Sequence, residues 1–174
     1  MGYEDIKISI NISGKSITRT GFINEIRDLL AKVKIKNDNI QFEVTETALM
    51  EDLNASIKVL REIKDMNIQI ALDDFGTGYS SLTYLKRLPI DVVKLDKDFI
   101  KNISKIAEEE VIVEYVIKLT HELKFKIVAE GIETKEHSEF LKLNSCDYGQ
   151  GYLFSKPINK EEFEKLFILD KRYD

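Results

Sequence analysis

Residues 68–82 read IQIALDDFGTGYSSL, and this stretch decides the class of fold. Its first part, Ile68–Asp73, is a largely apolar run of strand length that ends in the first of two adjacent acids. Glycines and serines follow at once, before a stretch that can form a helix. A buried strand that ends in polar residues and passes through a glycine turn into a helix is typical of an α/β protein with a parallel sheet.

The same alternation of apolar strand and amphipathic helix recurs along the chain. Apolar residues spaced three and four apart predict helices at Phe22–Val33, Ser56–Met66, Val111–Leu123, Lys135–Leu143 and Glu161–Leu169. Short apolar runs predict strands at Ile6–Ser13, Ile40–Thr45, Ile68–Asp73, Asp91–Asp96, Phe125–Glu130 and, more weakly, Cys146–Gln150. The sequence therefore predicts about six βα units.

Polar residues at the ends of the predicted strands decide between two architectures. An open doubly wound sheet would concentrate them on a few strands, where the strand order reverses. A (β/α)8 barrel gathers them from all its strands on one rim, and that is the pattern here. The chain has 174 residues, fewer than the ~200 of a whole barrel, so we expect an incomplete one. The polar residues are Asn11, Glu43, Glu46, Asp73, Asp74, Lys94, Asp96, Glu130, Glu133 and Gln150.

The composition limits the classes of protein that fit. A formal net charge of −5 argues against a surface for duplex nucleic acid, which needs clustered lysines and arginines. We expect a cytoplasmic protein without membrane contact, because the sequence has neither a membrane-spanning apolar run nor a signal-peptide pattern. The single cysteine, Cys146, excludes a disulfide within the chain. His121 and His137 fall on predicted helices away from the strand ends and receive no role.

The acids and the amide at the strand ends form a ligand set that offers only oxygen atoms. Asn11, Glu43, Asp73, Asp74 and Glu130 favour Mg²⁺ or Mn²⁺ over Zn²⁺, because hard cations prefer oxygen ligands. The adjacent Asp73 and Asp74 could hold two ions, an arrangement that serves phosphodiester hydrolysis. The alternative is that these residues are ordinary N-caps of the helices that follow.

Three further features admit both a functional and a structural interpretation. Lys94 either has a role in the site, where it orients a water or neutralises a phosphate oxygen, or forms a structural salt bridge with Asp96 or Glu130. The loop Gly76–Ser81 either folds over a ligand or is a plain turn. Glu130 is a candidate general base with Glu133 as its support, and Glu133 is equally a candidate helix cap.

In order and spacing, these motifs closely resemble the EAL domain of bacterial cyclic-di-GMP phosphodiesterases. The resemblance covers nearly the whole chain. Its most specific parts are DDFGTGYSSL at residues 73–82 and AEGIET at residues 129–134. The other matching segments are Asn11–Ser13, Glu43–Glu46, Lys94–Asp96 and Gln150–Tyr152.

The resemblance implies a modified, TIM-like (β/α)8 barrel that opens cyclic di-GMP to linear pGpG with Mg²⁺ or Mn²⁺. By position it implies that Lys94 contacts the catalytic water and that Glu130 is the general base or its metal-linked equivalent. Glu46 would brace the Gly76–Ser81 loop. The implied ligands of two metal ions are Asn11, Glu43, Asp73 and Asp74. The implied substrate-binding or supporting residues are Gly76, Thr77, Gly78, Asp96, Glu133 and Gln150.

The chain departs from the family's pattern before Asn11. The Glu-Ala-Leu motif belongs to the family's first strand, and the ten residues ahead of Asn11 do not contain it. We therefore expect residues 1–174 to be a partial, N-terminally truncated EAL domain that is weak or inactive without that metal-binding glutamate. An open sheet edge predicts a homo-oligomer. The parent protein could carry an upstream sensor or GGDEF-type domain.

Two other functions stay open. A non-catalytic module that binds cyclic di-GMP or a protein partner would share the fold, although such modules usually lose the acids that this chain retains. An unrelated metal-dependent barrel lyase would act on a small carbonyl acid and ignore cyclic di-GMP. Hydrolysis of cyclic di-GMP identifies the phosphodiesterase, and a binding titration separates the other two.

Overall fold

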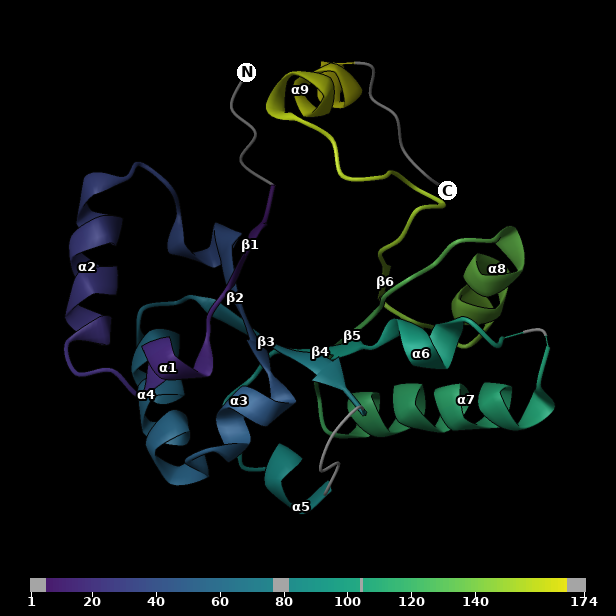
Figure 1. The fold of residues 1–174 in the computed structure, drawn as a ribbon, viewed down its shortest axis with the longest axis horizontal. Helices are drawn as coiled ribbons and strands as arrows, with labels where there is room; N and C mark the ends of the chain where they lie inside the picture. Colours follow the sequence, from purple (N-terminus) through teal and green to yellow (C-terminus); the bar gives the residue numbers. More distant parts are fainter. Residues whose placement is uncertain (1–5, 77–81, 104, 169–174) are drawn as a thin grey trace.

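The protein forms one curled, fully parallel sheet with helices outside it (Figure 1). This computed structural model describes residues 6–76, 82–103 and 105–168. The strands lie in sequence order, and each pairs in parallel with the next. They are β1 (Ile8–Asn11), β2 (Ile40–Thr45), β3 (Gln69–Phe75), β4 (Val92–Leu95), β5 (Lys126–Ala129) and β6 (Tyr148–Gly149). The six predicted βα units are confirmed.

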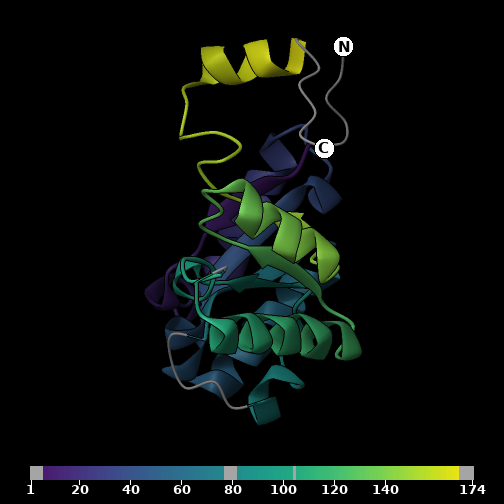
Figure 2. The same cartoon turned by 90° about the vertical axis from the view of Figure 1, so that its right-hand side faces the viewer.

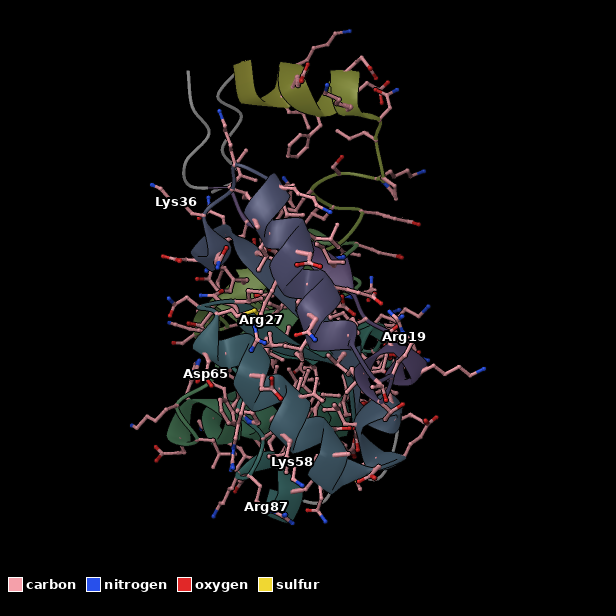
Figure 3. The ribbon with its side chains drawn as sticks, turned by 90° about the vertical axis from the view of Figure 1, so that its left-hand side faces the viewer. Arg19, Arg27, Lys36, Lys58, Asp65 and Arg87 are labelled. Carbon is pink, nitrogen blue, oxygen red and sulfur yellow. The ribbon has the colours of Figure 1, made fainter. Side chains whose placement is uncertain are left out.

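Sequential strand order excludes the doubly wound alternative. Right-handed crossovers between neighbouring parallel strands all lie on one face of the sheet, which curls it toward a barrel. The longer helices are α2 (Phe22–Lys32), α4 (Leu53–Asp65), α7 (Ala107–Glu122), α8 (Lys135–Leu143) and α9 (Lys160–Ile168). These confirm the five predicted helices within a few residues. Figure 3 shows α2 and α4 along one outer side, where Arg27 pairs with Glu62.

Periodicity did not predict the short helical segments. They are α1 (Gly14–Ile17), the 3-10 turn η1 (Asn37–Asn39), α3 (Glu46–Met50), α5 (Leu82–Leu85) and α6 (Lys97–Ile100). Each is too short for apolar spacing to reveal, and most follow directly on a strand end. Side chains cap three of them, since Ser13, Thr45 and Asp96 accept the N–H groups of α1, α3 and α6.

The core lies along the middle of the sheet. Every residue of β4 is buried, as is expected of a parallel strand covered on both faces. Ile70, Leu72 and Ile127 continue this core into the neighbouring strands. By contrast, β1 and β6 are exposed at every position. The middle of the sheet is therefore buried, whereas its two edge strands are exposed.

Two aspartates fix the amino ends of the strands, opposite the predicted site. Asp91 accepts the Ile70 N–H at 2.8 Å and pairs with Lys64. Asp147 accepts the Ile127 N–H at 3.0 Å and pairs with His121 and Lys126. His121, which the sequence left without a role, thus ties α7 to the start of β6.

The C-terminal helix α9 stands apart from the other helices, beyond the sheet, in both views (Figure 2). Among the helices of the described residues, none is long and apolar enough to cross a membrane.

Candidate active site

The register of the sheet brings the polar strand ends to one edge. Asn11 of β1 lies opposite Glu43 of β2, and Thr45 lies opposite Asp73 of β3. Glu130 follows β5 and donates its N–H to the Leu95 carbonyl at the end of β4. Because carboxyl ends of parallel strands share one edge, residues far apart in the sequence become neighbours here.

Lys94 lies at the centre of this edge with its side chain only 5% exposed. Its Nζ is 2.7 Å from Glu43 Oε2, 2.8 Å from Glu130 Oε1 and 3.0 Å from Asp73 Oδ1. The partners come from β2, β3 and the end of β5, so one ammonium joins four strands. Of the two salt-bridge partners that the sequence offered, Glu130 is one, and no ion pair to Asp96 is seen among the described residues.

The surroundings of Lys94 keep it charged. Burial by itself would lower its pKa, but the hydrogen-bonded and charged carboxylates of Glu130, Glu43 and Asp73 outweigh burial and raise the pKa above its usual value. A buried ammonium is tolerated only when such partners are present. Lys94 is therefore a fixed cation inside an acidic site.

A bulge at the end of β3 turns two adjacent acids toward the same place. In a regular strand Asp73 and Asp74 would point to opposite faces. Here the register with β4 shifts between Leu72 and Phe75, and Asp74 adopts a left-handed φ of 54°. As a result, carboxylate oxygens of Asp73, Asp74 and Glu130 lie within 4.8 Å of one another.

Burial in this cluster makes Asp74 and Glu130 weaker acids. Burial, followed by the charges of Asp73 and Asp96, raises the pKa of Asp74. Burial also raises the pKa of Glu130, although its pairing with Lys94 acts in the opposite direction. Like charges held this close are stabilised by a cation. Three carboxylates without nitrogen or sulfur donors suit a hard divalent cation, so the residues present fit the expected kind of metal ion.

Glu46 holds Gly76, the residue directly after β3. It is 1% exposed, and its Oε2 accepts the Gly76 N–H at 3.3 Å. Gly76 has a φ of 97°, and a Cβ there would lie 2.4 Å from the Phe99 ring, so glycine is required. The rest of the loop that Glu46 was expected to brace, including Thr77 and Gly78, lies outside the described residues.

The other predicted site residues lie outside the Lys94 ion pairs and the Asp73–Asp74–Glu130 cluster. Asp96 accepts the Asp98 N–H at 2.8 Å as the N-cap of α6. Glu133 is exposed, and the cap of α8 is its neighbour Thr134. Gln150 is exposed on the wall of a hollow of about 890 Å³ beside β6. Asn11 is exposed at the end of the edge strand β1.

Sequence reasoning missed Tyr84, which lies on the short helix α5 beside Glu46. Burial and the Glu46 carboxylate both raise the pKa of its phenol. Tyr84 is 5% exposed. The available signal was a tyrosine ten residues after Asp74, which is indistinguishable in sequence from a core aromatic residue.

Comparison with known proteins places this geometry in a family. The model of the family described as "EAL domain" matches residues 1–157. The cyclic di-GMP phosphodiesterase NbdA of Pseudomonas aeruginosa is 36% identical over 173 residues, which are 99% of this chain and 22% of NbdA. The chain thus spans about a fifth of the length of that relative.

Solved structures give the same result. The PaMucR phosphodiesterase in complex with c-di-GMP is 37% identical, with a TM-score of 0.88 over 93% of this chain and 66% of that one. BlrP1 of Klebsiella pneumoniae, in a manganese/cy-diGMP complex, is 31% identical, with a TM-score of 0.81 over 87% of this chain and 39% of that one. Both similarities confirm the barrel-type fold.

Proposed function

Because the chain belongs to the EAL domain family, we propose that it carries the site of a metal-dependent phosphodiesterase that opens cyclic di-GMP to linear pGpG. The observation that carries the proposal is the buried contact of Lys94 with Glu43, Asp73 and Glu130, next to the Asp73–Asp74–Glu130 cluster. A fixed cation among clustered acids is arranged for an anionic substrate that arrives with metal ions.

The proposed metal ligands are Asn11, Glu43, Asp73 and Asp74, for two ions of Mg²⁺ or Mn²⁺. The strand register supports this assignment, because Asn11 pairs with Glu43 and the bulge brings Asp74 beside Asp73. Bound divalent ions would neutralise phosphate oxygens and lower the pKa of a water molecule. The four carboxylates and one ammonium leave the site with excess negative charge, which favours cation binding.

Lys94 and Glu130 are proposed to act on the attacking water. As water adds to the phosphorus, one phosphodiester bond breaks and leaves a phosphomonoester and a hydroxyl. Glu130, whose pKa is raised by burial, accepts a proton from the water more readily than an ordinary glutamate. Lys94, held 2.8 Å from Glu130, orients the water and the carboxylate.

The remaining assignments concern substrate and support. Glu46 braces the strand end at Gly76. Gly76, Thr77, Gly78, Asp96, Glu133 and Gln150 are proposed to contact the substrate or support those that do. We also propose that residues 1–174 act as a partial EAL domain in the cytoplasm, as part of a homo-oligomer. The relative MucR is named as a bifunctional diguanylate cyclase and phosphodiesterase, which supports an upstream GGDEF-type domain in the parent protein.

The test is hydrolysis of cyclic di-GMP by the purified chain with Mn²⁺ or Mg²⁺. Glu130→Gln should abolish turnover, whereas Glu139→Gln, on the exposed side of α8, should not change it. Binding of cyclic di-GMP without turnover is the result expected of a site that lacks the Glu-Ala-Leu glutamate, and equally of a non-catalytic module. If the chain neither binds nor hydrolyses cyclic di-GMP, the proposed substrate is refuted.

A further inference from the structure

Two polar atoms near the site are buried, and neither forms a hydrogen bond of regular geometry within the part of the chain that the structure describes. They are Oε1 of Glu46 and the hydroxyl of Tyr84. An unpaired buried acceptor and an unpaired buried donor both destabilise a fold, because each has lost water without gaining a partner.

The two side chains are neighbours of complementary chemistry. Glu46 begins α3, directly after β2, and Tyr84 lies on α5. The Glu46 carboxylate is the charged group that acts on the Tyr84 phenol and helps keep it protonated. A protonated phenol donates, and a carboxylate only accepts, so the pair can form one strong hydrogen bond.

The other oxygen of Glu46 already holds the end of β3. Oε2 accepts the Gly76 N–H, two residues after Asp74. Asp74 has the left-handed φ of 54° that brings it beside Asp73 and Glu130. Left-handed backbone is less favourable for aspartate than for glycine, although aspartate tolerates it better than most residues, so a contact at Gly76 helps to maintain it.

Helix α5 packs Tyr84 into the core. Leu85, next to Tyr84, is 1% exposed, and Leu88 just beyond the helix is also buried. These leucines pack in the same core cluster as Tyr84. The Tyr84 ring is therefore held by core packing, which is what a positioning contact requires.

We propose that Tyr84 is a positioning residue: its hydroxyl donates to Glu46 Oε1 and thereby fixes Glu46, the Gly76 N–H and the bulge that aims Asp74. This inference deepens the proposed function, since it assumes that Asp73 and Asp74 bind the metal. It assigns to Tyr84 an effect on metal affinity rather than contact with substrate.

The test is Tyr84→Phe, which removes the hydroxyl and keeps the ring. Mn²⁺ affinity, measured by calorimetry, should fall about tenfold, the size of effect that supporting partners of metal ligands have. Glu46→Gln should also lower Mn²⁺ affinity. The Mn²⁺ affinity of the double variant should be close to that of the single variant that binds more weakly. Tyr115→Phe, at a residue 72% exposed on α7, is the matched control and should bind as the wild type does.

A second readout needs no metal. Hydrogen exchange of the Gly76 amide in metal-free protein should become about tenfold faster in Tyr84→Phe, while exchange of the buried Ile70 amide changes little. Equal acceleration at both amides would mean a loss of global stability alone, and would overturn the proposal. The proposal would also be overturned if Tyr84→Phe and Glu46→Gln had multiplicative effects on Mn²⁺ affinity. It would be overturned too if Tyr84→Phe left the exchange rate of the Gly76 amide unchanged.

The two readouts separate this inference from the proposed function. If wild-type protein binds no Mn²⁺ but Gly76 exchange depends on Tyr84, the metal-dependent function fails and the positioning contact stands. If Mn²⁺ binds and Tyr84→Phe alters neither affinity nor Gly76 exchange, the function stands and the role of Tyr84 is refuted.

Discussion

Nζ of Lys94 lies 2.8 Å from Oε1 of Glu130, and this ion pair joins the middle of β4 to the residue that follows β5. Glu43 and Asp73 complete the surroundings of the same ammonium. In the metal-free protein Lys94 is thus the cation that holds the acids together. Substituting it should affect stability and metal binding in different ways.

Lys94→Met should lower the free energy of unfolding of the metal-free protein by about 3–5 kcal/mol, because buried carboxylates lose their counter-charge. Urea unfolding with and without Mn²⁺ measures the effect. Mn²⁺ should restore more stability to the variant than it adds to the wild type. Lys101→Met, at an exposed residue of comparable size, should change stability by less than about 1 kcal/mol. Equal stability of Lys94→Met and wild type would contradict the bridging role.

Gly76→Ala and Gly21→Ala form a matched pair. Both glycines have positive φ, of 97° and 88°, so each alanine should cost about 1–2 kcal/mol of backbone strain. A Cβ at Gly21 meets nothing within 4 Å, whereas at Gly76 it lies 2.4 Å from the Phe99 ring. Denaturant unfolding should show a further loss of about 1–3 kcal/mol for Gly76→Ala. If the two variants are equally destabilised, the close approach of Phe99 is not a constraint.

The fold could be predicted from the sequence because the spacing of apolar residues reveals its strands and long helices. Apolar runs and helical spacing placed every strand and the long helices, and polar strand ends chose the barrel over the doubly wound sheet. These patterns reflect burial, which the sequence records directly.

The site was predictable in its members but not in its contacts. The sequence predicted a contact of Lys94 with Glu130. The ion pairs of Lys94 with Glu43 and Asp73 depend on the register of the strands and could not be predicted. The bulge that turns Asp74 depends on the packing of β3 against β4 and leaves no motif. The role of His121 as a partner of Asp147 was missed for the same reason, since α7 and β6 meet only in the folded chain.

Asp147 should make stability depend on pH in the acid range. Burial opposes ionisation, but Lys126, His121 and the Ile127 N–H outweigh it and hold the pKa of Asp147 below its usual value. A carboxyl with a lowered folded-state pKa stabilises the fold at pH above its unfolded value, which is about 3.9, and that stabilisation is lost as pH falls through the folded-state pKa. Asp147→Asn should therefore lose stability near neutral pH and show a flatter decline below about pH 4. Unfolding measured between neutral and acid pH tests this, and parallel curves for the two proteins would refute it.

Asp74→Asn should raise stability while it weakens metal binding. Asparagine tolerates left-handed backbone as well as aspartate does, so the bulge is preserved. Removing the charge relieves repulsion from Asp73 and Asp96, the same repulsion that raises the pKa of Asp74, and should stabilise the metal-free protein by about 0.5 kcal/mol. Mn²⁺ affinity should fall about tenfold or more, because a ligand oxygen loses its charge. Asp38→Asn, exposed on η1, should change neither quantity. Thermal unfolding and calorimetry on the same samples measure both, and a loss of stability together with unchanged Mn²⁺ affinity would show that Asp74 is a structural residue and not a ligand.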